Sequence, residues 1–132
     1  MIVVDTSVLV DFFRGVDNPP AVALARLGEG EASLASTMVC CQELLQGARN
    51  ETEWRMLHDY LSTQELLTAG DPLAAHVAAA RIFYDCRRQG ITLRGSIDCQ
   101  VAQLALENDA VLLHNDEDFE RIGSVRPLRR FF

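Results

Sequence analysis

The chain has 132 residues, of which 48% are hydrophobic and 23% charged, a balance typical of a globular domain. It excludes a disordered chain, and because the apolar runs are short we expect no membrane segment, no secretion signal and a cytoplasmic location. The formal net charge is −7 and all 12 basic residues are arginine, which excludes chemistry that depends on a lysine ammonium. A nucleic-acid substrate would need a local arginine cluster or bound cations to approach so acidic a chain.

The first part of the chain predicts one strand and two helices. Residues 2–4 are uniformly apolar and indicate a short buried strand that ends at Asp5. A helix is expected over residues 6–14, where apolar side chains recur on one side. Asn18 opens a second helix, because asparagine caps helices well and the proline after it suits the first helical position. This helix should end near residues 28–30.

Strands and helices continue to alternate through the rest of the chain. Residues 32–35 predict a strand, and the helix expected over residues 38–49 carries Glu43 and could be capped by Ser36 or Thr37. The later elements expected are a helix over 51–61, a strand over 65–68, a long helix that Asp71 opens and that ends by Gly90, a helix from Ser96 to Asn108, a strand over 110–113, and an edge strand over 124–128.

This alternation predicts an α/β fold. We expect a three-layer α/β/α domain, in which helices cover both faces of a central, mostly parallel sheet of about five short strands. No linker, repeat or biased segment interrupts the sequence, so residues 1–132 are expected to form a single domain. In such sheets the functional site lies at the carboxyl ends of the strands, where the strand order switches.

Three acidic residues fall at that edge. Asp5 follows the first predicted strand, and Asp116 lies three residues after Leu113, at the end of a later strand. Asp98 is in the first turn of a helix that runs antiparallel to that later strand, so its end of the helix meets the same edge. Glu43 lies about two turns into its helix, and topology alone does not place it in the crevice.

Crowded carboxylates repel one another strongly. Two like charges 4 Å apart cost about 4 kcal/mol at an effective dielectric constant of 20, so the cluster needs protons, basic partners or a cation. Arg94 is the only base near these acids in the sequence. A divalent cation is the simplest remedy, and a set of oxygen ligands favours Mg²⁺ or Mn²⁺ over zinc.

Each of these acids also has an ordinary structural explanation. Asp5 could cap the helix that follows it, and Asp98 is favoured near a helix N-terminus by the helix dipole. Asp116 and Asp118 could form Asx turns in a loop. Three such coincidences on one sheet edge are harder to accept than one shared function.

The sequence also resembles a known family in four ordered segments. The matching segments are Met1 to Val10, Glu43 to Gly47, Gly95 to Asp98 followed by Ala102, and Leu113 to Phe119. Together they resemble the motifs of PIN-domain nucleases, in particular the VapC-type toxins of type II toxin–antitoxin systems. The resemblance covers essentially the whole chain and implies a PIN-like fold.

The resemblance assigns roles residue by residue. It implies an acidic catalytic centre made of Asp5, Glu43, Asp98 and Asp116. Asp5 and Asp98 would be the principal metal ligands, while Glu43 or Asp116 would serve as a general base or as a ligand of a further ion. Ser7, Asn115 and Asp118 are expected to lie around these acids and to orient them through hydrogen bonds.

The function implied is Mg²⁺-dependent hydrolysis of RNA phosphodiester bonds by an endoribonuclease that acts as a toxin, with Mn²⁺ as another suitable ion. The partners implied are RNA, a cognate VapB-type antitoxin that fills a hydrophobic groove and blocks the acids with a basic side chain, and a second copy of the chain in a homodimer. DNA would be bound only through the antitoxin complex. Candidates for contact with RNA phosphates are Arg14, Arg49, Arg87, Arg88 and Arg94. For each of them a solvated or salt-bridged surface position is the more common explanation.

Other functions remain as alternatives. A phosphatase of the aspartyl-phosphate type is excluded because it needs a second aspartate where this chain has Ser7, and also a lysine. A topoisomerase-primase domain would have glutamate where Asp5 stands. A PIN nuclease of RNA processing or decay that is not a toxin stays open, and so does an inactive PIN-fold binding module.

Overall fold

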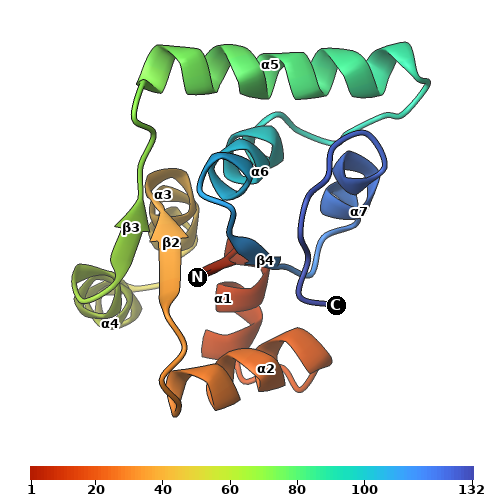
Figure 1. The fold of residues 1–132 in the computed structure, drawn as a ribbon. Helices are drawn as coiled ribbons and strands as arrows, with labels where there is room; N and C mark the ends of the chain where they lie inside the picture. Colours follow the sequence, from red (N-terminus) through yellow and green to blue (C-terminus); the bar gives the residue numbers. More distant parts are fainter.

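The computed structural model describes residues 1–132 and contains four strands and seven helices (Figure 1). In chain order these elements are β1 (Ile2–Val4), α1 (Thr6–Phe13), α2 (Pro19–Gly28), β2 (Leu34–Thr37), α3 (Met38–Gln46), α4 (Glu51–Ser62), β3 (Glu65–Leu67), α5 (Pro72–Arg88), α6 (Ile97–Glu107), β4 (Val111–Leu113) and α7 (Glu117–Gly123). None of the helices has the length and apolar character that crossing a membrane requires.

The four strands form one parallel sheet in the order β3-β2-β1-β4. Val3 in β1 is paired with Ala35 on one side and with Leu112 on the other. The chain therefore builds outward from β1 to β2 and β3, and then returns to place β4 on the free side of β1. The strand order switches between β1 and β4, which is where a crevice is expected in an open parallel sheet.

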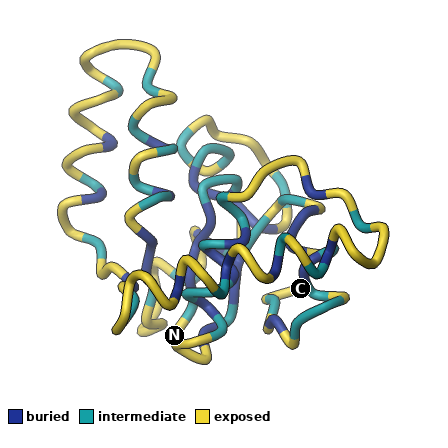
Figure 2. Tube along the Cα trace, turned by 90° about the horizontal axis from the view of Figure 1, so that it is seen from above, coloured by how far each residue is buried: buried dark blue, intermediate teal, exposed yellow.

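Helices cover both faces of the sheet, as the alternating pattern predicts. Val3 and Leu112 point into one hydrophobic cluster, which also contains buried residues of α5, α6 and α7. Val4 and Leu113, their neighbours in the chain, point into a second cluster with α1, α2 and α4 on the opposite face. Figure 2 shows buried residues gathered in the middle of the trace, with exposed residues along the outer sides of the helices. The predicted three-layer α/β architecture is confirmed.

Polar caps set the start of most helices. Asn18 accepts a hydrogen bond from the backbone N–H of Ala21 at 2.9 Å, and Asp71 accepts one from Ala74 at 3.1 Å. Of the two caps considered for α3, Thr37 is the one used, because its Oγ1 accepts from the N–H of Cys40. Such caps satisfy donors that the first helical turn leaves unpaired.

The structure differs from the predicted elements in four places. The sheet has four strands, because residues 124–128 form no strand. Pro127 has no N–H to donate, and regular pairing is reduced to a single parallel bridge between Leu112 and Arg130. The second strand lies two residues later than expected, and α3 ends at Gln46, before the expected end. The helix α7 was not predicted at all.

Candidate functional site

Five carboxylates from separate elements meet at the carboxyl edge of the sheet. Asp5 and Asp116 follow β1 and β4, the strands on either side of the switch point, and Asp98 is in the first turn of α6. Glu43 comes from α3 and Asp118 from α7. A cavity of about 520 Å³ opens over them, lined by Glu43, Arg94, Gly95, Ser96, Ile97, Asp98, Asp116 and Asp118.

Asp5 is held rigidly at the base of this site. Its residue is only 3% exposed, and its Oδ2 accepts hydrogen bonds from the N–H of Ser7 at 3.0 Å and from the Ser7 hydroxyl at 2.6 Å. The Ser7 Oγ in turn accepts from the N–H of Asn115 at 3.0 Å. One hydroxyl thus joins the turn after β1 to the turn after β4. The side chain of Asn115 donates to Asp11 instead, so it contacts none of the four predicted acids.

Glu43 reaches the cluster through a contact that topology could not anticipate. Its Oε1 accepts a hydrogen bond from the hydroxyl of Thr6 at 3.0 Å, so α3 packs with this side chain against the start of α1. Partial burial raises the pKa of Glu43, and the neighbouring charges of Asp5 and Asp116 raise it further.

Arginine side chains compensate the two acids of the last motif. Asp118 is 1% exposed and receives a hydrogen bond from Arg121 Nη1 at 2.8 Å, along with one from the N–H of Arg94 at 2.9 Å. Asp116 caps α7 by accepting from the N–H of Asp118, and its Oδ1 also accepts from the Arg94 guanidinium. Asp118 therefore has its charge matched inside the protein.

Asp98 has no such compensation. Burial raises its pKa to about 7, and the charges of four neighbouring carboxylates add to this shift, with no hydrogen bond from the protein to offset it. Those four are Asp5, Asp116, Asp118 and Glu43, the other members of the cluster. Glu43, Asp98, Asp116 and Asp118 also line the same cavity, so these acids occupy one electrostatic neighbourhood.

The donor set fits a hard divalent cation. Asp98, Asp116 and Asp118 each offer a carboxylate oxygen, and these oxygens lie within 4.8 Å of one another. Because Asp118 is already bound by Arg121 on one oxygen and by a backbone N–H on the other, the less compensated acids are better placed as ligands. Oxygen ligands of this kind suit Mg²⁺ or Mn²⁺.

Two residues at the site were missed by sequence reasoning. Thr6 positions Glu43, and the only signal was its place directly after Asp5. Arg121 neutralises Asp118 from three positions later on the same helix, a spacing that brings side chains together once the helix is recognised. Neither contact follows from the hydrophobic pattern, because both depend on how polar side chains of separate or unpredicted elements meet.

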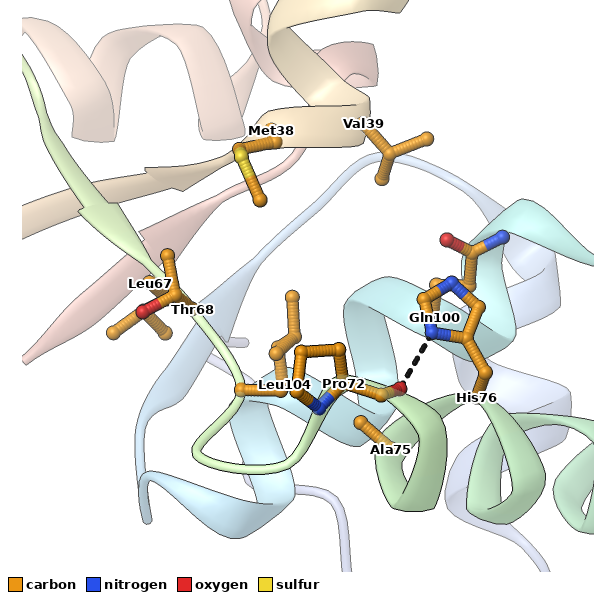
Figure 3. A pocket seen from close by; sticks show the side chains of 10 residues that line it. Met38, Val39, Leu67, Thr68, Pro72, Ala75, His76, Gln100 and Leu104 are labelled. Atoms are coloured by element: carbon orange, nitrogen blue, oxygen red, sulfur yellow. Dashed lines mark hydrogen bonds between the residues drawn. The ribbon is translucent and has the colours of Figure 1, made fainter.

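A second cavity, of about 140 Å³, lies apart from the acids between α3, β3, α5 and α6 (Figure 3). Met38 and Val39 face Pro72 and Ala75 across it, and none of its ten lining residues is acidic. His76, at its edge, is hydrogen bonded to the carbonyl of Pro72 at 2.7 Å. Six of its ten lining residues are hydrophobic, which distinguishes this cavity from the acidic one.

The raised pKa of Asp98 predicts how stability depends on pH. The folded chain holds this proton up to about pH 7, whereas the unfolded chain loses it near 3.8, so folding stability should fall as the pH rises through this range. Asp98→Asn removes the effect. The test compares the free energy of unfolding of this variant with that of the wild type, measured by denaturant unfolding in EDTA. After allowance for solvent screening, the variant's advantage should grow by roughly 1 to 3 kcal/mol between pH 4 and 7.

A matched control is Asp59→Asn, at an exposed position on α4. Because Asp59 lies outside the acidic cluster, this variant should show no comparable growing gain in the free energy of unfolding. If the gain from Asp98→Asn also failed to grow, burial among like charges would not describe Asp98.

Comparison with known proteins places the chain in a family. Residues 2–125 match the PIN domain family. Ribonuclease VapC11 of Mycobacterium tuberculosis is 33% identical over 130 residues, which cover 98% of this chain and 96% of that protein. Two solved structures share the fold: VapBC-1 from nontypeable Haemophilus influenzae has a TM-score of 0.72, 21% identity and coverage of 98% of this chain and 96% of that chain. DNA-bound VapBC from Salmonella typhimurium has a TM-score of 0.73 and 19% identity, with coverage of 98% of this chain and 95% of that chain. The chain therefore belongs to the PIN-domain family and is of the VapC type.

Proposed function

We propose that this protein is an Mg²⁺-dependent endoribonuclease, a single PIN domain over residues 1–132 that hydrolyses RNA phosphodiester bonds. The observation that carries the proposal is the gathering of Asp5, Glu43, Asp98 and Asp116 around one electrostatic centre. Ribonuclease VapC11 and its relatives are named for ribonuclease activity, which supports RNA as the substrate. Mn²⁺ could replace Mg²⁺, because both prefer oxygen ligands.

The contacts within the site suggest how these residues divide the work. Asp5 and Asp98 would be the principal ligands, because Asp5 is rigidly held and the Asp98 carboxylate has no hydrogen bond or ion pair within the protein. A divalent ion there would supply Lewis-acid chemistry, increasing the acidity of water and offsetting negative charge on the phosphate. Glu43 has a raised pKa and so suits a general base, and Asp116 is the other candidate for this role or for a further ligand.

Three surrounding residues would support the acids without touching the substrate. Ser7 fixes the orientation of Asp5, and the N–H of Asn115 fixes the Ser7 hydroxyl. Asp118 accepts a hydrogen bond from the backbone N–H of Arg94 and so fixes the chain at that point. Its buried ion pair with Arg121 holds the first turn of α7 in place. Such outer hydrogen bonds orient ligand side chains.

The metal mechanism predicts that Asp5→Asn and Asp98→Asn each lower Mg²⁺-dependent RNA cleavage by at least about 100-fold, because each removes a charged ligand. Asparagine still caps helices, so Asp5→Asn should keep its circular dichroism spectrum. Asp59→Asn should cleave RNA like the wild type. Cleavage that continues unchanged in EDTA would rule out the metal mechanism.

We further propose that the protein is the toxin of a toxin–antitoxin pair, acting in the cytoplasm, with a VapB-type antitoxin as partner. The similar solved structures are VapBC complexes, which supports this kind of partner. A groove between α1, α3 and α4 is the proposed seat of the antitoxin. It is lined by Val10, Phe13, Leu44, Met56 and Leu57, with Arg14, Gly47, Arg49 and Glu53 around them.

The place of this groove suits an inhibitor. Leu44 lines the groove and its neighbour Glu43 lines the acidic cavity, so α3 presents both surfaces within one turn. A partner segment seated on the apolar residues could continue into the cavity and place a basic side chain among the acids. DNA contacts would then come from the antitoxin, since a chain of net charge −7 repels DNA.

The toxin proposal predicts that expression of this chain alone arrests bacterial growth, and that co-expression of the small protein encoded beside it restores growth. Met56→Asp puts a charge in the proposed groove at a position 46% exposed, and should abolish the rescue while RNA cleavage by the purified variant stays unchanged. Harmless expression of an enzyme that cleaves RNA would instead indicate a nuclease of RNA processing or decay.

A homodimer is also proposed, with its contact on the face of α5 beside the apolar cavity of Figure 3. Leu73 and Val77 lie one helical turn apart and are 74% and 62% exposed, and Met38, which lines the cavity, is 63% exposed. A surface of this kind is unfavourable in water unless it is covered, and a two-fold axis would cover it with its own copy.

The homodimer proposal predicts a dimer in sedimentation equilibrium at micromolar concentration. The double variant Leu73→Asp/Val77→Asp should shift it to a monomer without loss of helical content. The same changes at two partly exposed positions of α2, Val22→Asp and Ala25→Asp, should leave the dimer intact. A wild-type monomer would overturn the proposal.

A further inference from the structure

The acidic site contains five carboxylates but only two arginines that pair with them. Arg121 is committed to Asp118, which is buried and has no other side-chain partner as close. Arg94 is the second arginine, and it pairs with Asp116 across the mouth of the cavity. Its contact differs from that of Arg121, because Asp116 is partly exposed and belongs to the four acids proposed for catalysis.

The backbone and the side chain of Arg94 have different degrees of freedom. The backbone is anchored by two contacts: its N–H donates to Oδ2 of buried Asp118 at 2.9 Å, and the preceding residue, Leu93, is packed in the core. The side chain is 70% exposed, and its Nη2 donates to Oδ1 of Asp116 while its Nε lies 3.9 Å from Oδ1 of Asp118. A guanidinium on a fixed anchor can therefore turn without any movement of the fold.

We propose that Arg94 is the internal counter-charge of the metal-free site, and that it leaves Asp116 to bind an RNA phosphate when a divalent cation joins the acids. The inference rests on the proposed nuclease function. It makes Arg94 a substrate-positioning residue with two alternative partners, one inside the protein and one on the RNA.

Electrostatics supports the exchange of partners. A guanidinium and a divalent cation that both approach Asp116 repel each other, so the bound cation weakens the Arg94–Asp116 pair. A phosphate is a better alternative partner, because the planar guanidinium can donate to two of its oxygens at once. Arg94 is also the only basic residue that lines the cavity, in a chain whose overall charge repels RNA.

The proposal predicts opposite effects of Arg94→Gln on the two ligands. Mn²⁺ titrated into the RNA-free protein in a calorimeter at low ionic strength should bind about three- to ten-fold more tightly, because a competing positive charge is gone. In cleavage assays at saturating Mn²⁺, the KM for an RNA oligonucleotide should rise at least about five-fold, because a charge-assisted phosphate contact is lost. Loss of a residue with only a structural role would not strengthen the binding of Mn²⁺ while weakening the binding of RNA.

Two further variants sharpen the test. Arg55→Gln removes the same charge from an exposed position on α4, near β3 and away from α7 in Figure 1, and should leave both constants unchanged. Arg94→Lys keeps the charge and should return Mn²⁺ affinity to near the wild-type value, while restoring KM only in part, because lysine cannot donate as a fork.

The outcomes separate this inference from the proposed function. If wild-type protein binds Mn²⁺ and cleaves RNA but Arg94→Gln behaves like Arg55→Gln, the inference is wrong and the nuclease stands. Weaker Mn²⁺ binding by Arg94→Gln would also overturn it, since Arg94 would then be organising the acids. If the wild type neither binds Mn²⁺ nor cleaves RNA, the proposed function itself fails.

Discussion

The repulsion among carboxylates at one edge of a parallel sheet is the constraint on which the rest of this structure depends. Left to themselves, these side chains would turn apart into water, since each close pair costs about 4 kcal/mol at an effective dielectric constant of 20. The fold prevents this by holding each acid with local contacts. Ser7 fixes Asp5, Thr6 fixes Glu43, and Arg121 fixes Asp118. Asp98 alone among the five accepts no hydrogen bond from the protein, and burial among like charges raises its pKa.

Several of these acids have a structural role beside the chemical role proposed for them. Asp5 caps α1 and Asp116 caps α7, so the ordinary explanation of both residues is correct as far as it goes. A cap also holds a carboxylate at a defined angle beside a helix N-terminus, where the positive end of the helix dipole moderates its charge. The local stability of the helices and the geometry of the site thus come from the same hydrogen bonds.

The parts that could be predicted from sequence are those in which one pattern decides the structure. The apolar strand at 2–4, the proline-opened helices α2 and α5, and the acids that follow β1 and β4 all have local signals. Glu43 could be placed only by family resemblance, because its position depends on how α3 packs against α1. The helix α7 has seven residues, four of them charged and only two large and apolar, too few for a helical pattern. Backbone hydrogen bonds hold the C-terminal segment beside β4, together with the ion pairs of Arg129 with Asp109 and of Arg130 with Glu120. Contacts between positions so far from a regular pattern leave no local sequence signal.

The hydroxyl of Ser7 accepts a hydrogen bond from a residue 108 positions later in the chain. One of the two segments that it joins is therefore synthesised at the start of translation and the other near the end. Asp116 can take its place in the site only after β4 has paired with β1. A nascent chain that stops before β4 carries three of the acids but no completed edge to hold them. The arrangement of acids proposed for catalysis is therefore complete only once nearly the whole chain has been made.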